Sequence, residues 1–130
     1  MFRKKAKKLP EVEGLPEGAV LRFVRTGGMR PTNDELVLVG DGRATITRGI
    51  RRQPIERTFA PENVRQVLGE LVLAGFFDMD GEIGEQVPDG YAYEIAVRSG
   101  GGARTVVTYD GSVPPALAPV LATLRGMLRS

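Results

Sequence analysis

The chain has 130 residues, 42% of them hydrophobic, and it contains neither histidine nor cysteine. The missing side chains exclude a histidine general base, a thiolate nucleophile and the histidine and cysteine ligands of zinc, so we expect no enzyme, no bound metal and no other cofactor. The length and hydrophobic content suffice for one domain with its own core. The formal net charge of +2 hides a mildly acidic body, because the first eight positions hold five bases, Arg3, Lys4, Lys5, Lys7 and Lys8.

We predict a basic, disordered N-terminal extension at residues 1–18 and a single folded domain at residues 19–130. No apolar stretch follows the basic residues of the extension, and no part of the chain has 18 consecutive apolar residues. We therefore expect a cytoplasmic protein with neither a signal peptide nor a membrane span.

The first half of the domain predicts strands, because apolar and polar residues alternate at 20–25, 35–40 and 43–48. Asp41-Gly42 predicts a two-residue hairpin between the second and third strands, and residues 55–59 are compatible with an additional short edge strand. Paired glycines end the first strand and begin a loop before the second. This loop consists of Gly27, Gly28, Met29, Arg30, Pro31, Thr32 and Asn33.

A helix is predicted from Pro61, because proline suits a first turn and Glu62 complements the positive end of the helix dipole. Gly75 suits a left-handed C-terminal cap, and Phe76 and Phe77 are then expected to enter the core. The apolar stripe of this helix, at 3.6-residue spacing, consists of Val64, Val67, Leu68, Leu71 and Val72.

Residues 78–90 carry five acids and no base, which predicts a long exposed loop. Asp78, Asp80 and Glu82 alternate as the oxygen ligands of a calcium loop do. However, Ile83 and Asp89 occupy the positions at which an EF-hand loop has glycine and glutamate. A solvated acidic loop is therefore the favoured interpretation.

The second half of the domain repeats the pattern with strands at residues 91–98 and 104–110 and a final helix that begins near residues 115–118. The apolar positions of this helix are Leu117, Val120, Leu121, Leu124 and Leu128. The resulting order, β-β-β-α-β-β-α, predicts an α+β fold in which an antiparallel sheet packs on two helices in two layers.

Arginine is concentrated in residues 22–65, with Arg48, Arg51 and Arg52 around one turn. Such a surface beside Tyr91 or Tyr93 could bind RNA, because bases stack on aromatic rings next to arginines. Alternating strand tyrosines more often pack in a core or across strands, and arginines also protect sheet edges from pairing with other chains. We therefore expect a monomer, and a nucleic-acid-binding module is a less favoured alternative.

Four segments of the chain form a recognisable series: residues 21–28 (LRFVRTGG), 71–77, 89–95 (DGYAYEI) and 105–110, the last followed by a Pro-Pro-Ala-Leu run. The series resembles emfourin-type inhibitors, which are similar in having an R-x-G-G opening strand, a helix that ends in an aromatic pair and a proline-led final helix. The resemblance covers about residues 20–128. The Asp-Gly hairpin and the basic turn at residues 48–52 depart from the family pattern.

The resemblance implies a proteinaceous inhibitor of thermolysin-type zinc metalloproteases, particularly intracellular protealysin-like ones, which occupies the protease cleft with a preorganised loop. The candidate contact residues are Gly27, Gly28, Met29, Arg30, Pro31 and Thr32, with Asp80 and Asp89 as carboxylates directed at the zinc ion of the protease. Met29 would enter an apolar specificity pocket. An ordinary turn explains the two glycines equally well, and an accessory protein-interaction domain without catalytic activity is the alternative function.

Overall fold

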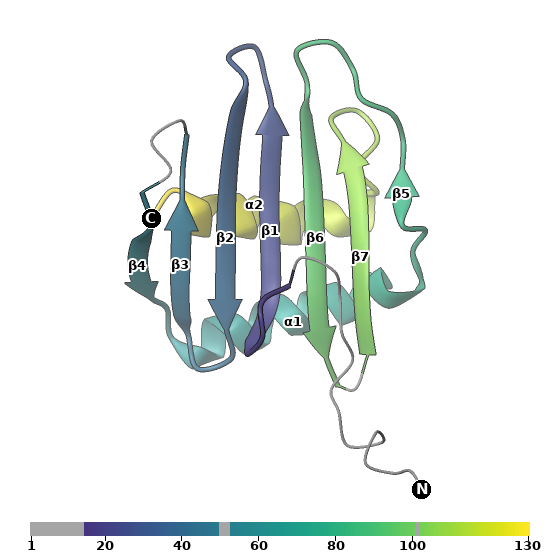
Figure 1. Ribbon diagram of the computed structural model, residues 1–130. Helices are drawn as coiled ribbons and strands as arrows, with labels where there is room; N and C mark the ends of the chain where they lie inside the picture. The colour runs from purple at the N-terminus through teal and green to yellow at the C-terminus, as the bar shows by residue number, and fades with distance from the viewer. Residues whose placement is uncertain (1–14, 50–52, 101) are drawn as a thin grey trace, which may run out of the picture.

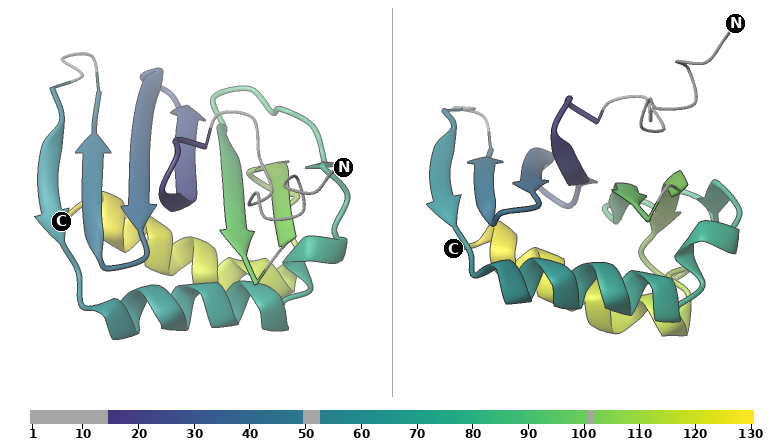
Figure 2. Two further views of the ribbon diagram at one scale, coloured as in Figure 1. Left: turned by 60° about the horizontal axis from the view of Figure 1, so that its bottom comes forward. Right: turned by 90° about the horizontal axis from the view of Figure 1, so that it is seen from below.

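The structure is a computed structural model that describes residues 15–49, 53–100 and 102–130. The predicted extension up to residue 14, and Arg51 and Arg52 of the basic turn, lie outside the described residues. The fold is a mixed α+β arrangement in which two helices cover one face of a seven-stranded sheet (Figures 1 and 2). This architecture agrees with the predicted two-layer α+β class.

The strands and helices lie at β1 (Ala19–Gly27), β2 (Thr32–Val39), β3 (Arg43–Thr47), β4 (Ile55–Thr58), α1 (Pro61–Leu73), β5 (Glu82–Ile83), β6 (Tyr91–Ser99), β7 (Gly102–Tyr109) and α2 (Ala118–Leu128). Two single-turn 3₁₀ helices, η2 (Phe76–Asp78) and η3 (Pro115–Leu117), follow α1 and precede α2. The connection between β2 and β3 spans residues 40–42, so it is one residue longer than the predicted two-residue hairpin.

The strand order is β4-β3-β2-β1-β6-β7-β5. Neighbouring strands are antiparallel except for β5, which pairs with β7 in parallel. The predicted order of five antiparallel strands is therefore too small: β4 agrees with the additional edge strand considered at residues 55–59, whereas the parallel edge strand β5 was not predicted. Strand β5 lies in the predicted acidic loop. The Val107 N–H donates to the Gly81 carbonyl at 2.8 Å, and Thr108 Oγ1 donates to the Ile83 carbonyl at 2.9 Å. A two-residue strand has no alternation to detect in the sequence.

The core lies between the sheet and the two helices, where cross-strand neighbours Leu21, Phe23, Leu36, Leu38 and Ile95 are fully or almost fully buried. From α1, Val64, Val67 and Leu71 pack into it. The prediction that Val72 belongs to the buried stripe is wrong, because its side chain is 56% exposed. The sheet contacts only a narrow stripe of α1, and Val72 lies about 100° around the helix from Leu71.

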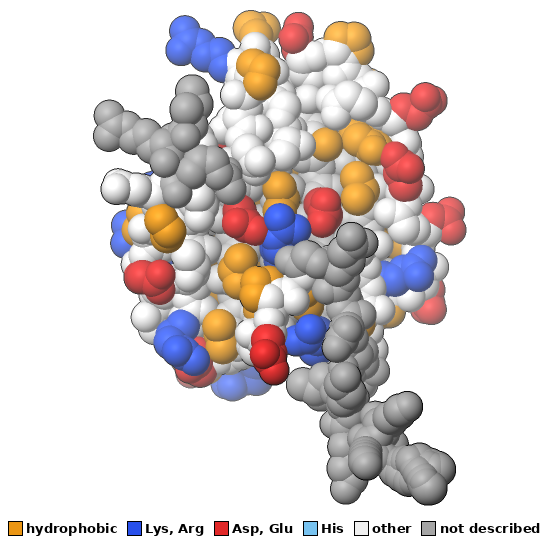
Figure 3. Space-filling model, in the orientation of Figure 1, with side chains coloured by type: hydrophobic (Ala, Val, Ile, Leu, Met, Phe, Trp, Pro, Cys, Tyr) orange, Lys and Arg blue, Asp and Glu red, His pale blue; other side chains and the backbone are white. Residues whose placement is uncertain are grey.

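The other face of the sheet carries charged side chains of both signs, which are interspersed over the part of the face that the described residues form in Figure 3. The Arg22 guanidinium on β1 pairs with Glu35 on β2 and, at 3.2 Å, with Glu94 on β6. Leu15 is also buried on this face, where it packs with Ala19 and Ala96. The folded domain therefore includes residue 15. In the part of the chain that the structure describes, no helix is long and apolar enough to cross a membrane.

Candidate functional site

The predicted contact loop is the turn of a β-hairpin. Strand β1 continues to Gly27, which pairs with Thr32 at the start of β2, so the turn itself is only residues 28–31. Met29 is 81% exposed on this turn. Figure 1 shows that the turn lies at the same end of the sheet as the connection from β5 to β6.

The base of the turn is pinned to the segment that leads into β6. The Gly28 N–H donates to the Gly90 carbonyl at 3.1 Å. Gly27 has a φ of +98°, and a Cβ atom on it would lie 2.6 Å from the same carbonyl oxygen. A position with both constraints accepts only glycine. The sequence predicts a turn that needs glycine for its backbone conformation. The structure adds a second reason for glycine here, the close approach of two backbone segments.

The Tyr91 ring packs against the base of the hairpin turn. A Cβ atom on Gly28 would lie 2.8 Å from the Tyr91 Cε1 atom, so the ring packs directly against the glycine backbone. On β1, the Arg25 guanidinium lies 4.7 Å from the centroid of the same ring, within the range of a cation–π interaction. Tyr91 therefore connects the hairpin to β6.

The Asp34 carboxylate fixes the other strand of the hairpin. It is 5% exposed and accepts hydrogen bonds from Arg25 Nη2 at 2.9 Å, Thr32 Oγ1 at 3.1 Å and the Gly49 N–H at 2.8 Å. Burial by itself would raise the pKa of Asp34, but the hydrogen bonds from Arg25, Gly49 and Thr32 and the Arg25 charge outweigh it, and the pKa lies below its usual range. Three segments are thus held by one ionised side chain.

Asp34→Asn is expected to lower the free energy of unfolding by about 1–3 kcal/mol at pH 7, because Arg25 loses its partner in a largely buried site. A depressed pKa stabilises the fold above the unfolded pKa of about 3.9, and this contribution is lost as the pH falls through the folded value. The difference between the variant and the parent should therefore shrink below about pH 4. Urea unfolding of the parent and the variant at pH 7 and pH 3 measures this difference in the free energy of unfolding. A difference that is the same at both pH values would contradict the stabilising role of the ionised Asp34 carboxylate.

A second turn, residues 87–90, lies beside the hairpin turn. The Gly90 N–H donates to the Val87 carbonyl at 3.0 Å, and Asp89 has a φ of +59°, as the third residue of a type II turn requires. The Gln86 side chain also donates to the Gly90 carbonyl at 2.8 Å. Val87 is 39% exposed. Asp89 therefore lies on a separate turn, and this turn is next to the predicted loop.

The Asp110 carboxylate holds the start of β6 beside the end of β7. It accepts the Tyr91 N–H at 2.8 Å and the Tyr93 hydroxyl at 2.6 Å. Burial, followed by the hydrogen bond to Asp110, raises the pKa of Tyr93 to about 12. Tyr93 is 1% exposed, which agrees with the expected core position and leaves no ring face on which a base could stack.

Asp80 lies elsewhere. It is exposed between η2 and β5, and strands β6 and β7 separate β5 from β1 and its turn. The turn that carries Asp89 thus lies beside the turn that carries Met29, whereas Asp80 lies apart from both. In the described ranges, no group of three or more acidic side chains is placed to hold a metal ion.

Several arginines of the basic half are engaged with acids or carbonyls. Arg25 pairs with Asp34, Arg43 with Asp41 at 2.8 Å, and the exposed Arg48 donates to the Arg129 carbonyl at 3.5 Å. The two ion pairs, of Arg25 and Arg43, reduce the positive field that phosphate binding needs.

Sequence reasoning missed the residues that support the turn. These are Arg25, Asp34, Tyr91 and Asp110. The run Pro88-Asp89-Gly90 was an available signal for the second turn, whereas the partners of the Asp34 and Asp110 carboxylates depend on strand pairing. A comparison of the chain with protein-family models found no match, and neither did a comparison with curated proteins.

Proposed function

We propose that this chain is an inhibitor of thermolysin-type zinc metalloproteases of the protealysin-like class, acting as a cytoplasmic monomer. One observation supports the proposal most: Met29 is 81% exposed on a turn whose two ends are fixed. On one side Gly28 bonds to Gly90, and on the other Asp34 binds Arg25 and Thr32.

A fixed, protruding apolar side chain suits insertion into a cleft. An exposed large apolar residue is disfavoured in water, and it regains the hydrophobic contribution when a partner buries it. Because the turn is held before binding, little conformational entropy is lost on association. Methionine is unbranched and adapts to irregular pockets. The chain needs no chemistry of its own, since occupying the cleft is sufficient.

The target class comes from the sequence resemblance, and direct titration tests it. The full chain is added to a protealysin-like protease and, in parallel, to thermolysin, with residual peptidase activity as the measurement. We expect loss of activity that is complete near one equivalent. A serine protease of similar substrate preference is the control and should keep its activity. Full activity of both metalloproteases with an excess of folded chain would contradict the proposal.

Asp89→Asn is expected to weaken inhibition at least about tenfold, because a carboxylate directed at the zinc ion of the protease is replaced by a neutral amide of nearly the same shape. Asparagine tolerates the positive φ at this position, so the turn should persist. The inhibition constant is compared with that of Glu85→Gln, which removes a nearby exposed acid. Equal inhibition by both variants would show that Asp89 does not reach the metal.

The alternative is an accessory interaction domain without inhibitory activity. The observation that favours it is a second exposed apolar side chain on the helical layer, Leu73, which is 89% exposed. Binding to a partner through α1 with no effect on metalloprotease activity would support this alternative.

A further inference from the structure

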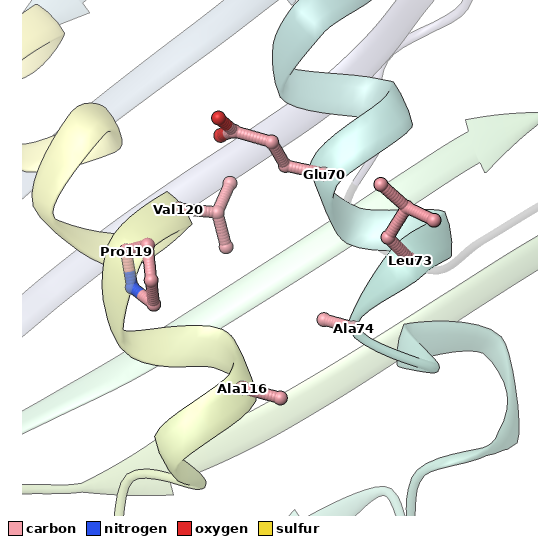
Figure 4. Close-up of a pocket in the computed structure, with 6 residues that line it drawn as sticks. All are labelled: Glu70, Leu73, Ala74, Ala116, Pro119 and Val120. Atoms are coloured by element: carbon pink, nitrogen blue, oxygen red, sulfur yellow. The ribbon is translucent and has the colours of Figure 1, made fainter.

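A pocket of ≈ 200 Å³ lies between the two helices, where Figure 4 shows its lining residues with the sheet strands behind the helices. Its walls are almost entirely aliphatic. Figure 4 shows three residues from α1 and its C-terminal end facing three from the η3–α2 segment; they are Glu70, Leu73, Ala74, Ala116, Pro119 and Val120. The volume is below the range of about 300–1,000 Å³ typical of metabolite sites, so the pocket suits a single side chain.

Glu70 is the one charged residue in this lining. Its carboxylate accepts one hydrogen bond, on Oε2, from the exposed Gln66 amide at 3.3 Å. Its Oε1 atom is buried and has no hydrogen-bond partner. An ionised carboxylate can accept about four hydrogen bonds, and burying an unsatisfied acceptor is costly. The site therefore lacks a donor.

The position of Glu70 in the helix also favours a positively charged partner for its carboxylate. It lies in the last turn of α1, which contains no basic residue, and the negative end of the helix dipole favours cations there. The first turn of α2 lies across the pocket, and its positive dipole end opposes this preference, but Pro119 in that turn has no N–H to donate to the Glu70 carboxylate. Both the charge and the dipole of α1 thus favour a cation in this pocket.

We propose that the pocket binds a lysine side chain presented by a partner protein. The aliphatic part of the lysine would lie against Leu73, Ala116 and Pro119, and its ammonium group would bind the Glu70 carboxylate. The terminal torsion of glutamate is soft, so a small rotation presents Oε1 to the ligand. The exposed Leu73 side chain at the rim, 89% accessible, supplies further apolar contact with the partner. This site is remote from the two turns and is independent of protease inhibition.

The test is a titration of the ¹⁵N-labelled full chain with Nα-acetyl-lysine methylamide, followed by amide chemical shifts. The comparison ligand is the norleucine analogue, which keeps the aliphatic chain and lacks the ammonium group. Two variants are titrated alongside, Glu70→Gln at the site and Glu62→Gln in the first turn of the same helix as the matched control. The amide spectrum of each variant shows whether it is folded.

We expect shifts that saturate in the millimolar range at the amides of residues 73–74, 116–118 and 120, with the norleucine analogue at least about tenfold weaker. Glu70→Gln should remove the preference for lysine over norleucine, and Glu62→Gln should retain it. Equal binding of the two ligands by the parent chain, or an unchanged preference in folded Glu70→Gln, would overturn the proposal. Shifts confined to other parts of the chain would do the same.

Discussion

Met29→Asp is expected to raise the inhibition constant against a protealysin-like protease by about two to three orders of magnitude. Truncating a central apolar anchor costs about 2–4 kcal/mol of binding free energy, and a carboxylate in its place would also have to be desolvated in an apolar pocket. The fold should be unaffected, because Met29 is 81% exposed. The inhibition constant and the thermal midpoint of the same preparation are the two measurements.

Two controls make this result specific. Met29→Leu keeps an apolar side chain of similar volume and should inhibit within about tenfold of the parent. Leu73→Asp adds the same charge at another exposed apolar residue, 89% accessible on the helical layer, and should inhibit as the parent does. If Met29→Asp inhibits as strongly as Leu73→Asp, the hairpin turn is not the contact.

Gly27→Ala is expected to lower the free energy of unfolding by about 3 kcal/mol. Two causes combine: the φ of +98° is unfavourable for alanine, and the new Cβ atom would lie 2.6 Å from the Gly90 carbonyl oxygen. A backbone oxygen cannot rotate away as a side chain can, so the two turns must separate. Urea unfolding measures the loss of stability, and the inhibition assay should show a weaker inhibitor.

Gly18→Ala is the matched control. Gly18 has a similar φ of +87°, but nothing lies within 4 Å of the place that an alanine methyl group would occupy, so only the backbone penalty of about 1–2 kcal/mol should remain. The difference between the two variants therefore isolates the contact with Gly90. Equal losses in the free energy of unfolding would mean that the two turns are not in contact. The proposal that they form one shared surface would then be wrong.

The elements predicted correctly are those whose burial repeats with the period of the backbone. Tyr93, Ile95 and Val97 fall on alternate positions of β6, and the structure buries all three. The same logic failed where an element is too short to show a period, as in the two residues of β5. It also failed at Val72, because its exposure depends on how much of α1 the sheet covers.

The site was predictable in its local part only. Two adjacent glycines and a proline predict a loop at this position, although not the hairpin that the structure shows, and Met29 between them is a visible apolar residue. The support of the turn is not local: Asp34 reaches Gly49, and Gly28 reaches Gly90. Hydrophobic periodicity carries no information on which polar groups meet across strands, so these contacts require the strand order.

The central position of β1 has a consequence for how the chain folds. This first strand pairs with β2, its neighbour in sequence, and with β6, where Leu21 meets Val97 and Gly27 meets Tyr91. Contacts between such distant residues raise the contact order and slow folding. During synthesis the hairpin can form early, but its turn stays without Gly90 and Tyr91 until β6 emerges from the ribosome. An incomplete chain therefore cannot present the proposed contact surface, which is complete only after β6 has paired with β1.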